Sequence, residues 1–281
     1  MEKSLFFEDL KSAAADFLRD SEGNYLAPDD ALRADLVGMR FFEDILWGAA
    51  EADDPLFTEL RRDSVVHPQV MLPSDWLPGA KSVVSFFLPF SEATKKSNAA
   101  NGEAPSDEWL HSRIEGQMML AALGEFIVSQ LRDAGFAAAF PTTDKRFRLI
   151  TPFVSNWSER HAAYICGLGT FGLSKGLITE RGMAGRFGSV ITDAEIAATE
   201  RKYSSPFEYC TMCGACQYRC PAGAIDKSRG AALGKDQPLC ASFLKEMTFP
   251  PHGAHGRIRY GCGKCQVKVP CESAVPQKIS G

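Results

Sequence analysis

The sequence contains no apolar run near the ~20 residues that a membrane-spanning helix needs. Its N-terminal stretch is charged and amphipathic and lacks the pattern of a signal peptide. It also has no glycine-rich dinucleotide fingerprint that would identify a cofactor, and no internal repeat of solenoid length. We therefore expect a soluble, cytoplasmic protein with no membrane contact.

What is present is enough apolar material for a folded core. The chain has 281 residues, of which 45% are hydrophobic, and this suffices for one large or two modest cores without disulfides. Its net charge of -4 is unevenly distributed. Residues 201–281 hold 12 Lys and Arg against 5 Asp and Glu, a net charge of +7, so residues 1–200 carry -11.

Residues 1–200 show helical and strand patterns in alternation. We expect helices over 3–19, from Ser106 to a Gly135 cap, and over 158–166. Strands are expected over 80–88, 137–140 and 185–193, and a long loop over 91–106. This alternation favours a layered α/β domain over residues 1–200. Residues 201–281 have few aliphatic side chains and need an inorganic core.

Eight of the nine cysteines lie at or after position 210. The run Cys210-x2-Cys213-x2-Cys216-x3-Cys220-Pro221 matches the bacterial ferredoxin pattern. In that pattern the first three thiolates bind one [4Fe-4S] cluster and the fourth binds another. A zinc site is the alternative, but zinc sites use one or two Cys-x2-Cys pairs rather than four cysteines in so short a run.

A second set of cysteines follows in the order that a two-cluster ferredoxin requires. By ferredoxin logic, Cys240, Cys262 and Cys265 bind the second cluster together with Cys220. Cys271 then returns to complete the first cluster. The spacing Cys265-x5-Cys271 is longer than the usual x3, which makes Cys271 the assignment that departs most from the pattern.

The basic residues of this segment have two interpretations. Two oxidised clusters with four thiolates each carry about -2 apiece, so the segment's +7 falls to about +3. Arg219, Lys264 and Lys268 can therefore balance cluster charge, and we prefer this interpretation to a nucleic-acid patch.

Beyond the cysteines, several stretches resemble the catalytic core of epoxyqueuosine reductases, cobalamin-dependent iron-sulfur enzymes related to reductive dehalogenases. They are the helix after Ser106, the pair Glu159-Arg160, and Gly79-Ala-Lys-Ser-Val-Val, Leu88-Pro-Phe90, Gly167-Leu-Gly169, Leu177-Ile178, Thr192-Asp193, Leu239-Cys-Ala-Ser-Phe-Leu-Lys-Glu246 and Tyr260-Gly-Cys-Gly-Lys-Cys-Gln266. The resemblance implies an α+β or α/β fold. A nitroreductase-like, cobalamin-type domain over 1–200 would precede a two-cluster ferredoxin-like domain over 201–281.

The resemblance also implies a cobalamin held by the first domain. We assign its contacts to Ser155, Asn156, Gly167, Gly169 and Gly172. The glycines allow the backbone to approach a large planar ligand closely. Equally, they cap a helix and form a turn.

The catalytic acid of the family has no counterpart at its usual place. In the family an acidic residue precedes the Glu-Arg pair by six positions, where this chain has Phe153, and residues 147–158 contain no carboxylate. His161 and Tyr164 in the next predicted helix are the candidate proton donors, although two such residues on a helix more often pack than catalyse.

Three functions follow from these observations. The first is an oxidoreductase whose two [4Fe-4S] clusters relay electrons to cobalamin and reduce a small-molecule substrate. The second is a ferredoxin-like electron-transfer protein, or a reductive activator of a corrinoid protein, without its own cobalamin. The third is epoxyqueuosine reduction on tRNA. Each needs a low-potential electron donor such as a ferredoxin or flavodoxin. The acidic balance of residues 1–200 and a sequence that stops at Gly281, without the family's C-terminal helical repeats, argue against tRNA as a partner.

Overall fold

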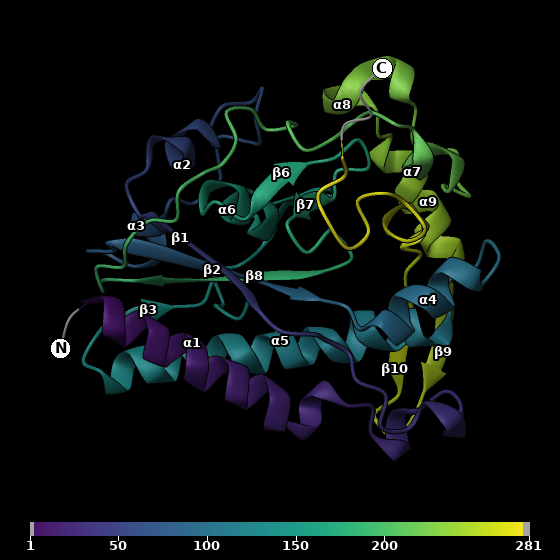
Figure 1. Ribbon diagram of the computed structural model, residues 1–281, viewed down its shortest axis with the longest axis horizontal. Coiled ribbons are helices and arrows are strands. Elements are labelled where there is room, and N and C mark those ends of the chain that lie inside the picture. Colours follow the sequence, from purple (N-terminus) through teal and green to yellow (C-terminus); the bar gives the residue numbers. More distant parts are fainter. Residues whose placement is uncertain (1–2, 278–281) are drawn as a thin grey trace.

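The computed structural model describes residues 3–277 and is built around one antiparallel sheet (Figure 1). The strand order is β1-β2-β8-β3. The bounds are β1 Leu46–Glu51, β2 Ser82–Pro89, β8 Gly185–Thr192 and β3 Ala138–Ala139. All eight residues of β2 are buried, because this strand has a neighbour on each edge and a layer on each face.

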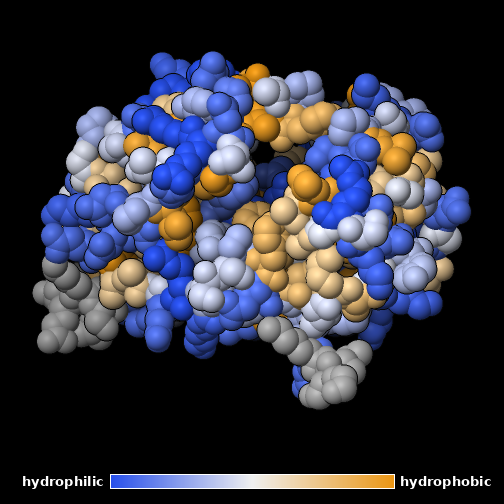
Figure 2. Space-filling view, turned by 90° about the horizontal axis from the view of Figure 1, so that it is seen from above, coloured by the Kyte–Doolittle hydropathy of each residue, from blue (hydrophilic) through white to orange (hydrophobic). Residues whose placement is uncertain are grey.

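Helices cover one face of the sheet, and a helix with a small hairpin covers the other (Figure 1). α1 (Lys3–Asp20) and the 27-residue α5 (Asp107–Asp133) lie below the sheet in this view. α6 (Glu159–Ile165) and the hairpin of β6 (Gly169–Phe171) and β7 (Leu177–Thr179) lie above it. Seen from this upper side, the molecule has a hollow near its middle (Figure 2).

Short elements complete the part of the chain that precedes the cysteine-rich segment. They are the 3-10 helices η1 Glu22–Asn24, η2 Pro28–Asp30 and η3 Ala34–Leu36, the helices α2 Pro55–Glu59, α3 Pro73–Trp76 and α4 Glu92–Ala100, and the hairpin β4 Leu149–Thr151 with β5 Val154–Ser155.

The cysteine-rich segment lies at one end of the sheet and consists of short elements (Figure 1). They are α7 Ala215–Tyr218, η4 Lys227–Arg229, α8 Gly230–Leu233, α9 Gln237–Glu246, the hairpin β9 Thr248–His252 with β10 Arg257–Tyr260, and η5 Lys264–Gln266.

The long elements lie where the sequence predicts them. α5 begins at Ser106, whose hydroxyl accepts a hydrogen bond from the Trp109 amide, and the chain turns after it at Gly135 with φ +88°. The mixed α and β content is as predicted, although every strand pair in the sheet is antiparallel. No helix within residues 3–277, α5 included, is both long and apolar enough to cross a membrane.

The loop predicted over residues 91–106 is wrong, because α4 occupies most of it. The Ser91 hydroxyl accepts from the Thr94 amide and caps the helix, and Asn98 is buried on its inner side. The chain-breaking residues Asn101, Gly102 and Pro105 all follow the helix. These residues mark the end of α4 and do not make the whole segment a loop.

Candidate functional site

Four cysteines, which we call set I, line one small cavity of about 20 Å³: Cys210, Cys213, Cys216 and Cys271. Burial, and then the nearby Cys216, Cys210 and Cys213, raise the pKa of the Cys271 thiol to about 12. The structure therefore brings Cys271 to the first three cysteines, as the ferredoxin pattern predicts, despite its longer spacing.

The loop that carries Cys271 is held by the segment leading into β8. The Met183 amide donates to the Cys271 carbonyl at 3.1 Å. Gly182 has φ +76°, and a Cβ at this position would lie 2.1 Å from the Glu272 carbonyl oxygen. Only glycine allows this close backbone approach, so Gly182 fixes the position of Cys271.

The other four cysteines of the segment, set II, line a second cavity of about 310 Å³: Cys220, Cys240, Cys262 and Cys265. Burial raises the pKa of the Cys262 thiol to about 11, and the nearby Cys265, Cys220 and Cys240 contribute to the rise. Residues from α5, α6 and β8 form the opposite wall of this cavity. All eight thiols are free, so no disulfide competes for them.

The thiols are not arranged around a single ion. Within residues 3–277, no three Cys, His, Asp or Glu side chains are close enough together to hold one metal ion. A tetrahedral zinc ion needs its thiolates about 2.3 Å away. An iron-sulfur cube separates its four thiolates more widely, because each thiolate binds a different iron.

The two sets have different surroundings. Around set I the packing is apolar and includes Leu173, Ile178, Met183 and Val269. Set II shares its cavity with four cationic side chains, and its described lining includes no Asp or Glu; the cations are Arg113, Arg160, Arg186 and Lys235.

Two of the cations predicted to balance cluster charge also bind the end of α4. Lys264 is 1% exposed, and its ammonium donates to the carbonyls of Asn98 and Asn101. Arg219 donates to the Ala99 carbonyl, and Asn98 donates back to the Cys262 carbonyl at 3.0 Å. Cations are favoured at the carboxyl end of a helix, where carbonyls lack partners. These contacts fasten the set II loop to residues 1–200.

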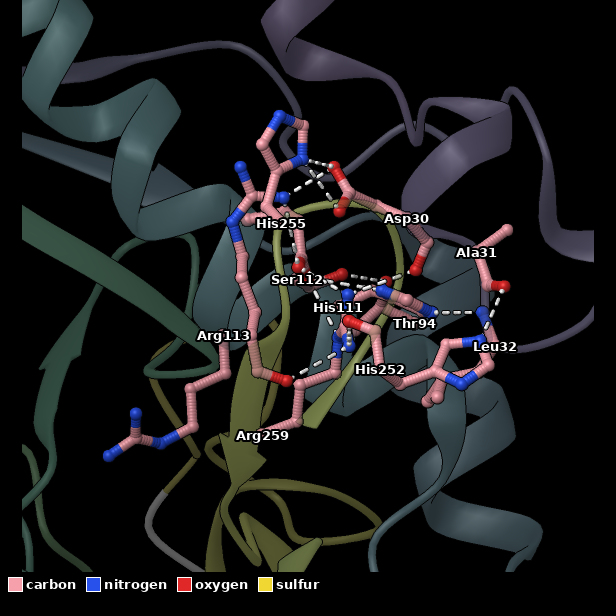
Figure 3. Close-up of polar contacts among 12 residues, drawn as sticks. Asp30, Ala31, Leu32, Thr94, His111, Ser112, Arg113, His252, His255 and Arg259 are labelled. Carbon is pink, nitrogen blue, oxygen red and sulfur yellow. Dashed lines mark hydrogen bonds and ion pairs between the residues drawn. The ribbon is translucent and has the colours of Figure 1, made fainter. Parts of the chain in front are cut away.

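The hairpin β9–β10, between Cys240 and Cys262, is tied to η2 and α5 by buried ion pairs (Figure 3). Arg259 is 1% exposed, donates to Glu115 at 2.7 Å and also donates to the Asp30 carbonyl at 2.9 Å. Arg257 and His255 both pair with the Asp30 carboxylate.

We call these groups, together with His111, the hairpin clamp. Burial alone would raise the pKa of Asp30, but the bonds from His255 and Arg257 outweigh it and lower that pKa. His111 accepts from the Leu32 amide through Nε2, which leaves its Nδ1 proton to donate to Glu115.

The residues predicted to contact cobalamin have protein partners. Ser155 donates to the Trp157 carbonyl, and the Asn156 amide bonds to the backbone of Arg146 and Arg148. A Cβ on Gly167 would meet Thr199, and one on Gly169 would lie 1.9 Å from the Ile178 carbonyl. Gly172 lines the set I cavity. Their contact with a corrinoid stays a prediction.

His161 and Tyr164 pack within α6 and its surroundings. The His161 ring lies 4.8 Å from the Phe171 ring and its Nδ1 lies 2.8 Å from the Ser158 hydroxyl. Burial, and then the charges of Arg160 and Lys175, lower the pKa of His161 to about 4, so it is neutral at pH 7. The Tyr164 ring stacks on Tyr203, and burial raises its pKa. Neither residue is part of the lining of the two cysteine cavities.

The sequence interpretation missed the cationic wall of the set II cavity. Arg160 entered it only as part of the Glu159-Arg160 pair, and Arg113 and Arg186 did not enter at all. These side chains come from three elements far apart in sequence, so no local sequence pattern predicts that they line one cavity. Glu159 also has a shifted pKa: burial raises it to about 7, while hydrogen bonds from Ser189 and Thr142 oppose the rise.

No protein-family model matches the chain, and no curated protein matches it. Solved structures do. A catabolic reductive dehalogenase aligns with a TM-score of 0.55 at 16% identity, over 83% of this chain and 30% of that one. An epoxyqueuosine reductase bound to a modified tRNA-Tyr stem loop aligns with a TM-score of 0.54 at 17% identity, over 96% of this chain and 66% of the enzyme.

The structural neighbours are epoxyqueuosine reductases and reductive dehalogenases. A selenomethionine-labelled epoxyqueuosine reductase aligns over 98% of this chain, with a TM-score of 0.50 and 18% identity. The TM-scores of these alignments show a shared fold, which confirms the resemblance predicted from the motifs. The chain spans about two thirds of the length of the tRNA-bound reductase and less than a third of the dehalogenase.

The prediction against a tRNA partner is wrong. A neighbour that shares its fold with 96% of this chain was solved with a tRNA stem loop bound. The prediction relied on the net charge of residues 1–200 and on the absence of the family's helical repeats. Net charge is a poor guide here because binding depends on where charges lie, and cations from this part of the chain gather at the set II cavity.

Proposed function

We propose that the chain is an iron-sulfur oxidoreductase of the epoxyqueuosine reductase or reductive dehalogenase type. In this proposal set I and set II each hold one [4Fe-4S] cluster, and the clusters pass electrons to a cobalamin at the layer formed by residues 1–200. The observation that carries it is the grouping of eight thiols into two sets of four, each around its own cavity.

The donor sets fit the clusters by number and by chemistry. Four thiolates per site is the usual ligation of a [4Fe-4S] cluster. Both sets combine residues distant in sequence, Cys271 in set I and Cys220 in set II, so each cluster would join the two halves of the segment. Because the segment has little apolar core of its own, we expect cluster binding to supply much of its folding energy.

The set II cavity fits a cofactor by position. Its volume of about 310 Å³ lies at the lower end of the usual range for small-molecule sites, ~300–1,000 Å³. It is bounded by set II on one side and by α5, α6 and β8 on the other. Cobalamin, when bound, would supply strongly reducing chemistry. Phe90, Trp109 and Phe243 would exclude water from its surroundings.

The first substrate to test is epoxyqueuosine in tRNA, because two neighbours that align over nearly all of this chain are epoxyqueuosine reductases. Protein purified without oxygen and loaded with cobalamin should convert an epoxyqueuosine-modified stem loop to the queuosine form with a low-potential donor, a ferredoxin or flavodoxin. It should also restore queuosine in a strain that lacks the usual enzyme. Fully clustered protein that binds cobalt but fails both assays would direct the search to halogenated or other small molecules.

A second candidate is electron transfer without a bound cobalamin, including reductive activation of a corrinoid protein. The hairpin β4–β5 favours it, because Phe153 is exposed at its turn where the family has its proton donor. Protein with two clusters that reduces a separate corrinoid protein, yet retains no cobalt after purification from cobalamin-fed cells, would establish this function instead.

A further inference from the structure

Three short elements beside set I pack against one another and form an outer face of the molecule. Gly214 caps the start of α7, and a Cβ on it would lie 3.0 Å from the Lys227 side chain of η4. The Lys227 amide donates to the Gln217 side chain of α7 at 2.7 Å. α8 follows η4 directly and lies away from the sheet (Figure 1). The chain that carries set I therefore continues into an outward-facing surface.

This surface, which we call the η4 face, exposes apolar and cationic side chains together. Tyr218 of α7 is 82% exposed, more than any other large apolar side chain described, and Leu233 of α8 is 66% exposed. Lys227 and Arg229 of η4 are exposed as well, and within residues 3–277 neither side-chain end takes part in a hydrogen bond or a close ion pair. Aromatic side chains and arginines are enriched at protein interfaces, where they act as anchors.

The η4 face has a positive charge. Residues 217–235 contain four Lys or Arg and one Asp, a net charge of +3. The aspartate, Asp226, is engaged as the cap of η4, where its carboxylate accepts from the amide and the hydroxyl of Ser228. Two oxidised clusters would still leave residues 201–281 at about +3. Exposed charges of one sign steer partners of the opposite sign, so this face fits an acidic partner.

Set I is the cysteine set that reaches the surface here. Cys213 is exposed, whereas the other seven cysteines of the two sets are buried or half-buried. Set II instead lines a cavity whose opposite wall comes from α5, α6 and β8. Electrons cross between proteins only over short distances, so a donor must dock beside the cluster nearest the surface. Electron-transfer interfaces are small, below about 1,200 Å² in total, so a few anchors suffice.

We propose that the η4 face, through Tyr218, Lys227 and Arg229, docks an acidic electron-donor protein of the ferredoxin class that delivers electrons to set I. This assignment rests on the proposed function, because it needs a cluster at set I. In each encounter one electron leaves the reduced iron-sulfur centre of the donor and enters the set I cluster. The donor is oxidised, the cluster is reduced, and no bond or proton is exchanged. Electrons thus enter at set I and leave through set II.

RNA fits the η4 face less well than an acidic protein does. Surfaces that bind single-stranded RNA combine a track of cations with several aromatic side chains on which successive bases stack. Tyr218 is the only aromatic residue of α7, η4 and α8. A reacting nucleotide would also have to reach the cavity that set II and residues 1–200 enclose. Binding of RNA at the η4 face is therefore an outcome that the test must separate from donor docking.

The test measures docking and needs no turnover. An oxidised plant-type [2Fe-2S] ferredoxin is titrated by calorimetry, without oxygen, into protein with both clusters assembled. We expect one ferredoxin per chain, with binding weakened about tenfold at low salt by Lys227→Glu and by Arg229→Glu, and less at high salt. Tyr218→Ala should weaken binding at every salt concentration, because it removes an apolar anchor. Lys245→Glu is the matched control: it changes the charge equally at an exposed position, but on α9, which carries Cys240 of set II.

The rate of cluster reduction is a second readout. With reduced ferredoxin in rapid mixing, the second-order rate constant should fall in Lys227→Glu and lose most of its salt dependence, whereas Lys245→Glu should keep both. Iron analysis shows whether each variant retains its clusters. If Lys227→Glu loses iron, because its side chain packs near Gly214, then Arg229→Glu and Tyr218→Ala carry the test.

Three results would overturn the assignment. They are the absence of saturable ferredoxin binding, equal weakening in Lys245→Glu, and displacement of the ferredoxin by an RNA stem loop whose own binding is lost in Lys227→Glu. Ferredoxin binding at the η4 face of a protein that never reduces a corrinoid would leave the docking surface standing and refute the proposed function alone. Corrinoid reduction with a chemical reductant, in protein that does not bind the ferredoxin, would refute the docking surface alone.

Discussion

The two cysteine sets use the same ligands in opposite environments. Set I lies among Leu173, Ile178, Met183 and Val269, and its three N-terminal members follow one another in a single short run. Set II lies among cations, and the whole hairpin β9–β10 separates Cys240 from Cys262. Its geometry depends on parts of residues 1–200, through α4 and the hairpin clamp. Both sets thus depend on residues 1–200, set I through Gly182 and Met183 at the Cys271 loop, and set II through α4 and the hairpin clamp.

The largest effect should come from breaking the hairpin clamp. Arg259→Leu leaves Glu115 buried without its main partner, and an uncompensated buried charge typically costs about 3–5 kcal/mol of unfolding free energy. We expect iron to fall to about four per chain, lost from set II while set I remains. Denaturant titration measures the loss of unfolding free energy, and iron analysis measures the loss of iron.

The control for the clamp is Arg62→Leu, which removes an exposed pair with Glu59 and should cost less than about 1 kcal/mol. Equal iron loss from both sets in Arg259→Leu would contradict the separate dependence of set II on the clamp.

The complementary variant acts on set I. Gly182→Ala forces a left-handed residue and a Cβ against the Glu272 backbone, and we expect a loss of about 2–4 kcal/mol together with iron from set I alone. Gly79→Ala has a similar φ of +80° with open space around its Cβ, so it isolates the conformational cost of about 1–2 kcal/mol. If the two variants behave alike, the close approach at Gly182 does not position Cys271.

The next prediction concerns the buried carboxyl group of Glu159, which bonds to Thr142 and Ser189. The folded pKa of Glu159, about 7, is above its unfolded value of 4.5, so the folded state retains a proton that the unfolded state releases. Stability should therefore fall as the pH rises from about 4.5 to 7 and then level, by on the order of 3 kcal/mol. Glu159→Gln should remove this slope in urea titrations between pH 5 and 8. An unchanged slope would show that Glu159 ionises normally.

The smallest expected effect concerns the reduction potentials. Cations near set II stabilise the extra electron, so its cluster should be reduced at a higher potential than the cluster of set I. Lys235→Gln should lower the potential of set II by on the order of tens of millivolts. Spectroscopic titration of the clusters measures both potentials, with Lys11→Gln as the control. If Lys235→Gln shifts only the potential of the set I cluster, the cations act on set I, and the assignment of a cationic environment to set II is wrong.

The sequence predicts the ligands better than their surroundings. Thiol spacing constrains chemistry directly, so the sets could be grouped before the fold was known, including Cys271. The hairpin β9–β10 has no strand pattern in the sequence, because Pro250 and Pro251 disfavour strands; an isolated two-stranded ribbon tolerates them on its open edge. Arg113, Arg160 and Arg186 line the set II cavity only through tertiary packing, which no local pattern encodes.

The most direct test of the account is the iron content of protein purified without oxygen from cells supplied with cobalamin. The account predicts about eight irons per chain, about four in Cys271→Ser and about four in Cys262→Ser, because each cluster has four irons and each variant removes one thiol from a different set. Eight irons that persist in Cys271→Ser, or zinc in place of iron, would contradict the assignment of two clusters to set I and set II.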